Sequence, residues 1–231
     1  MKKFFNFMKN SHTKSMVKMV FILTFLLFIY TSLCAFSYAK STSSDIADSV
    51  FRLHVLANSD SSEDQALKYK VRDNLLDYMN SICSETTSKD EAISIASSHL
   101  DDFKKIAEDT ILANGYNYTV QVQIGNFEFP TKTYGDISLP AGYYDALRVN
   151  IGEAKGQNWW CVMFPPLCFI DVSSGVVPDE SKEVLKDSMD EEEFALVSES
   201  DENSEINFKF KILEWFGKSG FMTAKKENVK E

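Results

Sequence analysis

The amino-acid sequence predicts an α+β fold, in which a helical hairpin packs on a mostly antiparallel sheet behind an N-terminal hydrophobic signal or anchor helix. Three observations predict this fold class. The first 39 residues contain a long apolar run and no acid. Two stretches then repeat their apolar residues at helical spacing. After Tyr116 the spacing changes to two, which is the period of a strand with one solvated face.

The N-terminal segment, residues 1–39, predicts an export signal or a membrane anchor. It carries five Lys, and its uncharged stretch of 21 residues from Met19 to Ala39 is long enough to cross a bilayer as a helix. Small residues precede a cleavage between Ala39 and Lys40, which favours a signal that is removed. A retained anchor is the alternative. In both cases the positive-inside rule predicts that the rest of the chain leaves the cytoplasm.

The rest of the chain is strongly acidic. The formal net charge is −10 and residues 1–39 contribute +5, so residues 40–231 carry −15. Phosphate backbones are bound by local positive charge, and this charge therefore argues against nucleic acid as a partner. Only three of the 24 basic residues are arginine, whose planar guanidinium binds two oxygens at once. We expect at least two of Arg52, Arg72 and Arg148 to contact carboxylates or carbonyls.

Shifts in composition divide the chain into six parts. A Ser-rich stretch after the signal predicts a short linker. A stretch dense in Asp and Glu near the C-terminus predicts a solvated segment of low order. The expected parts are 1–39 (signal or anchor), 40–49 (linker), 50–178 (α+β domain), 179–205 (acidic, low order), 206–218 (amphipathic segment) and 219–231 (tail).

Two helices are expected in the first half of the domain. The first covers about 63–83 and follows 58–61, a stretch that offers several capping residues. Among them, Asp60 lies three residues before Glu63 in a spacing typical of a helix start. The second begins at Ser88, with an acid at its third position, and ends at the Asn-Gly pair near residue 115. Together they predict a helical hairpin that covers one face of the sheet.

Four strands are expected around these helices. Alternating apolar residues predict them at 51–58, 116–124, 143–151 and 159–164. The last two strands are separated by a short turn, which predicts that they pair with each other as a hairpin. A long loop is expected at 126–142, and loops of that length in compact domains are often functional.

The sequence contains no recognisable catalytic or metal-binding motif. It has three His, and it lacks HExxH, CxxC, GxSxG, P-loop and glycine-rich dinucleotide patterns. Zinc ligands at close spacing are missing as well. We therefore predict a protein that is not an enzyme and has no cofactor, metal or small-molecule substrate, with an extracytoplasmic hydrolase as a less favoured alternative.

Two cysteines flank a Pro-Pro pair. Cys161 and Cys168 are seven residues apart, and the prolines between them favour a bend that would bring the two sulfurs together. Oxidation is permitted outside the cytoplasm, so we favour a disulfide between them. The alternative is a pair of buried thiols that act as small hydrophobic side chains.

Two surfaces are candidates for binding a partner. The first is the loop at 58–64, with Asp60 and the nearby strand residues Arg52 and His54. Helix capping alone also explains the acids of this loop and is the simpler explanation.

The second candidate surface is the aromatic stretch NWWCVMFPPLCFID, residues 158–171, together with the loop at 135–142. Its strand is apolar on both faces, so helices can cover one face while a partner covers the other. The Pro-Pro bend is expected to make Phe164 and Leu167 protrude, although core packing is the alternative. The candidate residues are Trp159, Trp160, Phe164, Leu167 and Phe169.

Three blocks of sequence resemble one family. They are FRLHVLANSDSSEDQALKYKVRDNLLDYM (51–79), LPAGYYDALRVNIGEAKGQNWWCVMFPPLCFID (139–171) and FKFKILEWF near the C-terminus. The blocks are long and occur in the order found in the stage II sporulation protein R family of endospore-forming Firmicutes, which this chain resembles.

The resemblance implies a role in signalling during sporulation. Proteins of this family are made in the forespore and exported into the space between the two membranes, after contact with the membrane through the N-terminal segment. There they activate a membrane-embedded aspartic protease of the mother cell, which removes the pro-sequence of sigma-E. The resemblance therefore implies a secreted ligand without a cofactor. A membrane-anchored extracytoplasmic structural or interaction protein is the alternative.

Overall fold

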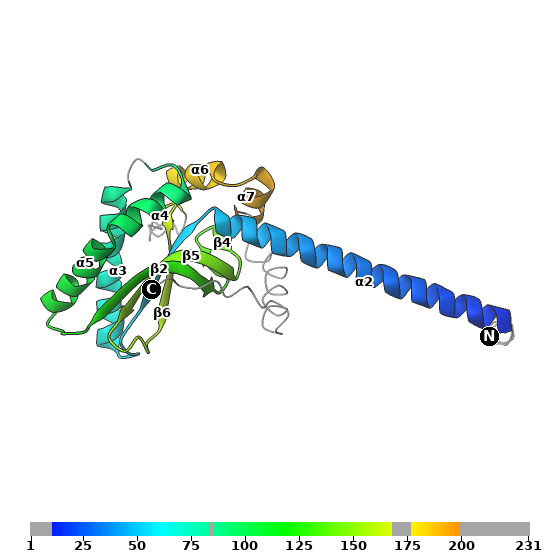
Figure 1. Ribbon diagram of the computed structural model, residues 1–231, viewed down its shortest axis with the longest axis horizontal. Coiled ribbons are helices and arrows are strands. Elements are labelled where there is room, and N and C mark those ends of the chain that lie inside the picture. Colours follow the sequence, from blue (N-terminus) through cyan, green and yellow to red (C-terminus); the bar gives the residue numbers. More distant parts are fainter. Residues whose placement is uncertain (1–10, 84–85, 168–176, 199–231) are drawn as a thin grey trace. The chain divides into compact units, whose positions relative to one another are not determined.

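The computed structural model describes residues 11–83, 86–167 and 177–198 (Figure 1). The chain divides into two compact units, with the boundary after Thr42. The fold is mixed α/β with a mostly antiparallel sheet and an apolar N-terminal helix, as predicted.

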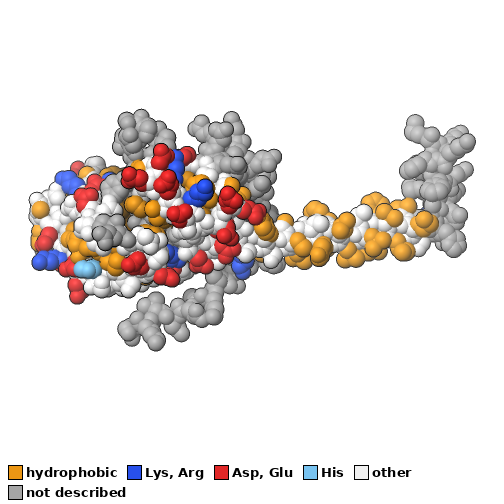
Figure 2. Space-filling view, turned by 90° about the horizontal axis from the view of Figure 1, so that it is seen from above, with side chains coloured by type: hydrophobic (Ala, Val, Ile, Leu, Met, Phe, Trp, Pro, Cys, Tyr) orange, Lys and Arg blue, Asp and Glu red, His pale blue; other side chains and the backbone are white. Residues whose placement is uncertain are grey.

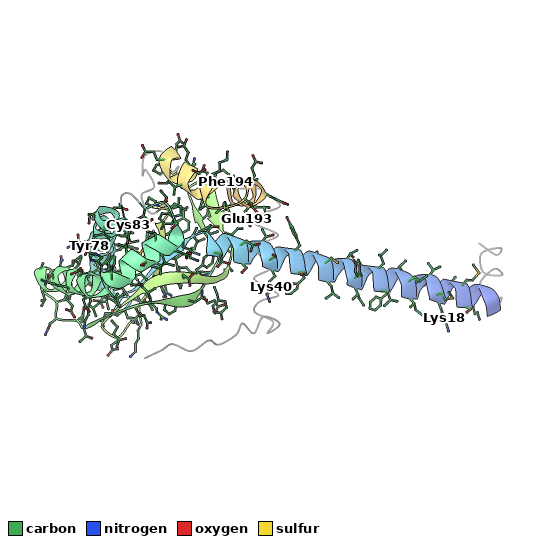
Figure 3. The ribbon with its side chains drawn as sticks, turned by 45° about the horizontal axis from the view of Figure 1, so that its top comes forward. Lys18, Lys40, Tyr78, Cys83, Glu193 and Phe194 are labelled. Atoms are coloured by element: carbon green, nitrogen blue, oxygen red, sulfur yellow. The ribbon has the colours of Figure 1, made fainter. Side chains whose placement is uncertain are left out.

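The first unit consists of most of helix α2, Ser11–Asp48. Its large apolar side chains are mostly exposed, and Figure 2 shows apolar side chains along the visible face of the helix, whose labelled Lys18 and Lys40 can be followed in Figure 3. A helix that is apolar all round is typical of a segment surrounded by lipid. Within the described residues, one helix segment, Lys14–Asp48, is long and apolar enough to cross a membrane.

The second unit begins inside the stretch predicted as a linker. Helix α2 continues through this stretch to Asp48, and Ile46 and Ala47 are buried in the folded unit together with Val50. The linker prediction for 40–49 is therefore wrong. The many serines concealed these three apolar residues, whose burial holds the last turn of the helix in place.

A four-stranded sheet forms the centre of the second unit. Its strands are β1 (Phe51–Leu56), β2 (Val120–Phe129), β5 (Gly142–Ile151) and β6 (Asn158–Phe164), in the order β2-β5-β1-β6. Strand β1 runs parallel to β5, and the other neighbours are antiparallel. The predicted hairpin between β5 and β6 is wrong, because β1 lies between them. Every residue of β1 is buried, which suits a central position.

Helices α3 (Ser62–Ile82), α4 (Lys89–Ser98) and α5 (Leu100–Ala113) cover one face of the sheet. Ser88 caps α4 as expected, and Ser61, one of the offered cap residues, caps α3 by accepting at its Oγ from the Asp64 backbone N–H at 3.2 Å. The second predicted helix is interrupted at His99, whose Nδ1 lies 2.8 Å from Asp102 Oδ2 and 2.8 Å from Tyr78 Oη.

A second, smaller core lies beyond the sheet. It contains a short ladder of β3 (Lys132–Tyr134) and β4 (Ile137–Leu139), so the predicted long loop is wrong over these residues. It also contains α6 (Asp179–Asp187) and α7 (Glu191–Ser198). Leu185 and Val197 of these helices are fully buried. Figure 2 shows many acidic side chains on this side of the unit.

The acidic segment is therefore more ordered than its composition predicts. Helix α7 presents Glu193 and Phe194 next to each other (Figure 3), and Phe194 packs against the second core while Glu191 and Glu192 stay exposed. A few apolar residues at helical spacing are enough to bind an otherwise acidic helix to a core. The predictions for 199–205, 206–218 and 219–231 lie outside the described residues.

The loop after β1 forms hydrogen bonds both with the start of α3 and with the segment that connects β5 to β6. Buried Asp64 accepts hydrogen bonds from Asn58 Nδ2 at 2.8 Å and Ser59 Oγ at 2.6 Å. Burial alone would raise the pKa of Asp64, but hydrogen bonds from Ser59, Asn58 and Tyr118 hold it below its usual value. The Gly156 backbone N–H donates to the Ala57 carbonyl at 3.0 Å. Asp64 therefore has a structural role at the start of α3.

Gly156 has no room for a side chain. A Cβ atom at this position would lie 2.2 Å from the backbone oxygen of Ser59. We expect Gly156→Ala to lower the free energy of unfolding by about 2–3 kcal/mol, because the backbone of the loop would have to shift. Urea unfolding measures this difference. Gly142→Ala is the matched control, since its nearest contact is 3.5 Å. Equal stability of the two variants would contradict the prediction.

Candidate functional site

Four side chains form a row across the sheet on the face opposite α3–α5, which we call the second face. Leu53, Val55, Leu147 and Val149 pack in the core beneath the helices, so the alternate residues of β1 and β5 point to the second face. Register pairs Gln123 with Arg148, Arg148 with His54, and His54 with Trp160. Gln123, Arg148, His54 and Trp160 are the cross-strand row.

Arg52 lies beside this row and is completely buried. Its Nη2 donates to Tyr134 Oη at 2.6 Å, and Tyr134 Oη donates to the Trp160 carbonyl at 3.1 Å. The guanidinium carbon is 4.1 Å from the centre of the Phe129 ring and 4.6 Å from that of Tyr144. Nε and Nη1 have no hydrogen-bond partner. Within the described residues, Arg52 thus lies between aromatic faces without a carboxylate, which is a cation–π arrangement.

The tyrosines around Arg52 are neutral. Burial raises the pKa of Tyr144 and of Tyr134, and the Arg52 charge opposes both shifts only in part. Tyr144 Oη donates to the Pro140 carbonyl at 2.6 Å. Neutral phenols can act as donors here, and their ring faces supply the electron density that holds the guanidinium.

His54 is 4% exposed and stacks on Trp160, with ring centres 3.7 Å apart. Its Nε2 lies 2.7 Å from Asn158 Oδ1, which makes Nε2 the protonated nitrogen, and Nδ1 has no partner. Burial, which is the largest cause, and the charges of Arg148 and Arg52 together lower the pKa of His54 to about 4, against the opposing effect of the Asn158 hydrogen bond. His54 is therefore neutral at physiological pH.

Arg148 is the half-buried, solvent-facing cation of the row. Its guanidinium carbon is 5.3 Å from the centre of the Phe127 ring, and its Nε has no hydrogen-bond partner. Neighbouring Asn150 also has a buried Oδ1 without a partner. Gln121, Gln123 and Asn158 on the same side are exposed. Polar, aromatic and cationic side chains are thus accessible to solvent at this end of the second face.

The prediction for the arginines is wrong for two of the three. Arg72 forms an ion pair with Asp73 and lies 4.4 Å from the centre of the Trp159 ring. Within the described part of the chain, Arg52 and Arg148 contact aromatic rings and a phenol and make no carboxylate or carbonyl contact. The scarcity of arginine is the sequence signal that pointed to them, but their partners lie on other strands.

The aromatic stretch divides between the two faces. Trp160 belongs to the second face, whereas Trp159 faces the helices, where its ring centre is 5.2 Å from that of Tyr69. Phe164 is buried in the larger core and Leu167 in the second core. The prediction that Phe164 and Leu167 protrude is therefore wrong, and core packing is the correct alternative for both. Phe169 lies outside the described residues.

The structure therefore groups the residues of the two predicted surfaces differently from the sequence analysis. Arg52 and His54, placed with the 58–64 loop, instead join Trp160 of the aromatic stretch across the β1–β6 pairing. Asp60 is exposed and does not belong to this group. The sequence missed Phe129, Tyr134 and Arg148 as neighbours, because each comes from a different strand.

The cysteines take two forms. Cys161 is disulfide-bonded, while Cys34 and half-buried Cys83 are free. Burial raises the pKa of the Cys83 thiol, which makes it unreactive (Figure 3). Cys168 lies outside the described residues, and the Cys161–Cys168 pairing stays a prediction. So does cleavage between Ala39 and Lys40, two residues that are part of α2.

An acidic depression is present elsewhere in the second unit. It is lined by the carboxylates of Asp45, Asp48, Asp187, Asp190 and Glu193. Across the residues that the structure describes, no group of three or more His, Cys, Asp or Glu is arranged to hold a metal ion. The second face, with its buried unpartnered donors, is the better candidate for recognition.

Comparison with known proteins agrees with the resemblance. The family model for stage II sporulation protein R matches residues 47–174, which include the whole four-stranded sheet and α3–α5. Stage II sporulation protein R of Bacillus subtilis (strain 168) is 39% identical over 181 residues, which cover 74% of this chain and 81% of that protein. No solved structure matches the chain. The chain belongs to the stage II sporulation protein R family.

Proposed function

We propose that this protein is an exported signal that activates a membrane-embedded aspartic protease of the mother cell, so that pro-sigma-E is processed. The observation that carries the proposal is family membership over residues 47–174, which gives the chain a role in sporulation. The second face supports a binding function, because it joins unpartnered donors with aromatic rings at a solvent-exposed end of the sheet.

Export from the forespore into the intermembrane space is part of this proposal. The helix over Lys14–Asp48 supports it, since its length and composition are compatible with secretion and with membrane anchoring. The acidic second unit would then act as the ligand outside the cytoplasm, and α2 would provide the route or the attachment.

One observation favours the alternative of a membrane-anchored structural or interaction protein. Helix α2 runs without a break through Ala39 and Lys40 to Asp48. A retained helix would hold the second unit close to the membrane surface. The mass of the exported chain separates the two cases, because cleavage after Ala39 removes 39 residues and retention removes none.

Reconstitution tests the signalling function. We expect that producing this chain together with the membrane protease and pro-sigma-E in a non-sporulating host yields processed sigma-E, which immunoblotting measures. A chain without residues 1–39 controls for export, because it stays in the cytoplasm and should give no processing. Processing that is equally efficient without this protein would contradict the signalling function.

A further inference from the structure

The cross-strand row and the neighbouring Arg52 contain buried polar atoms that form no hydrogen bond within the described residues. Nε of Arg148 and Nε and Nη1 of Arg52 are buried donors without partners, and Nδ1 of His54 is a buried ring nitrogen without one. A buried polar group without a partner lowers the stability of the folded state, because it has lost its hydrogen bonds to water. Arg148 is the half-buried residue among these three, so its guanidinium is the group that a ligand could reach.

The charge of this neighbourhood is opposite to that of the chain. The whole chain carries −10, yet the second-face residues of the four described strands include two arginines and no Asp or Glu. The charges that act on His54 are those of Arg148 and Arg52, and both disfavour its protonation. A positive surface without a counter-charge is complementary to an anion.

Arg148 is the group through which an anion would enter. It is half-buried, it carries a planar fork of donors, and in the described protein it contacts the Phe127 ring rather than an acid. Arginine is suited to two parallel hydrogen bonds with a carboxylate, which lysine cannot form. Arg52 is too deeply buried to contact the anion, but its positive charge contributes to the attraction.

We propose that the cross-strand row binds an Asp or Glu carboxylate in an extended segment of a protein partner, with Arg148 as the carboxylate-binding residue. This inference rests on the proposed function, because the partner is the activated protease. The carboxylate would pair with the Arg148 fork, and an apolar neighbour in the same segment would pack on the exposed side of Trp160.

A peptide segment fits this surface better than a lipid headgroup. Gln123 of the row and the neighbouring Gln121 and Asn158 are exposed, and their amides can bind the backbone N–H and C=O groups of a peptide. The strands of the second face carry no Lys. A surface made for anionic lipid would be rich in Lys and Arg, and the acidic chain is repelled by an anionic membrane.

Direct binding is measured first, on the exported chain, by NMR. The probes are the peptide acetyl-Glu-Glu-Glu-Glu-amide, the matched acetyl-Gln-Gln-Gln-Gln-amide, inorganic phosphate, and vesicles of phosphatidylglycerol. We expect the Glu peptide to shift the Arg148 Nε–H and Trp160 indole signals in a saturable way. The Gln peptide should leave both signals unchanged, and Arg148→Glu should abolish the Trp160 shift.

Activation is measured next, in the reconstituted assay. Arg148→Glu is expected to reduce processed sigma-E by about tenfold or more, because it places two negative charges opposite each other. Arg148→Lys is expected to give an intermediate loss, since it keeps the charge without the fork. Lys104→Glu is the matched control, a half-exposed residue of α5 on the helical side, and should behave as the wild type.

The outcomes separate this inference from the proposed function. Unmoved signals with the Glu peptide, or shifts with phosphate or vesicles in its place, would overturn carboxylate recognition. A folded Arg148→Glu variant that activates normally would also overturn it, and an unchanged thermal midpoint shows that the variant is folded. If the wild-type chain fails to trigger processing, the proposed function fails, and the peptide titration still decides whether the row binds a carboxylate.

Discussion

Replacing Arg52 with alanine is expected to lower the free energy of unfolding by about 3–5 kcal/mol. The side chain is fully buried, with its guanidinium between the rings of Phe129 and Tyr144. Its removal leaves a cavity between two aromatic faces and takes away the hydrogen bond to Tyr134. Urea unfolding monitored by tryptophan fluorescence measures the loss.

The matched variant Arg52→Met separates volume from charge. Methionine fills most of the same space without a buried cation, so we expect it to remain within about 1.5 kcal/mol of the wild type. Arg52 has two unpartnered nitrogens, and removing an incompletely paired buried charge costs little when the volume is kept. An alanine variant as stable as the methionine variant would show that the cavity is not the main effect.

The stability of the second unit is expected to fall between pH 6.5 and pH 4 through His54. Burial and the neighbouring arginines lower the pKa of His54 from 6.5 to about 4. Between these values the unfolded chain binds a proton that the folded protein does not, so stability decreases as the pH falls. This shift corresponds to about 3 kcal/mol by pH 4.

The variant His54→Gln isolates this effect from the many carboxylates. Glutamine does not titrate, and its amide can donate to Asn158 Oδ1 in place of Nε2. We therefore expect the stability difference between the wild type and the variant to change by about 3 kcal/mol from pH 7.5 to pH 4. Urea unfolding at several pH values measures it. A difference that stays constant with pH would mean that His54 keeps its ordinary pKa.

Local patterns were sufficient for most elements. The apolar spacing of 63–83 predicts α3 to within a residue of its observed ends, because that face packs on the sheet. The alternation of 143–151 predicts β5 in the same way. Helix α7 was missed, since its buried Val197 is surrounded by acids whose exposure dominates the composition.

Pairing between strands could not be predicted from local patterns. The short turn at 152–157 favoured a hairpin of β5 and β6, but β1 pairs with both. Strands β1 and β5 are parallel, and parallel strands can pair only if a crossover connects them. The helices α3–α5 form part of this crossover, so the two strands lie far apart in the sequence. The insertion of β1 brings His54 against Trp160 and Arg148.

The sequence by itself determined the N-terminal apolar helix, the helical segments of the first core, the four strands of the central sheet, the acidic charge and the family. Each depends on the spacing of apolar residues or on an ordered set of residues along the chain. Only the tertiary structure decided that Arg52, His54, Arg148 and Trp160 meet on one face, and that Phe164 and Leu167 are core. Those facts depend on strand order and register, which are set by the burial of β1 between β5 and β6.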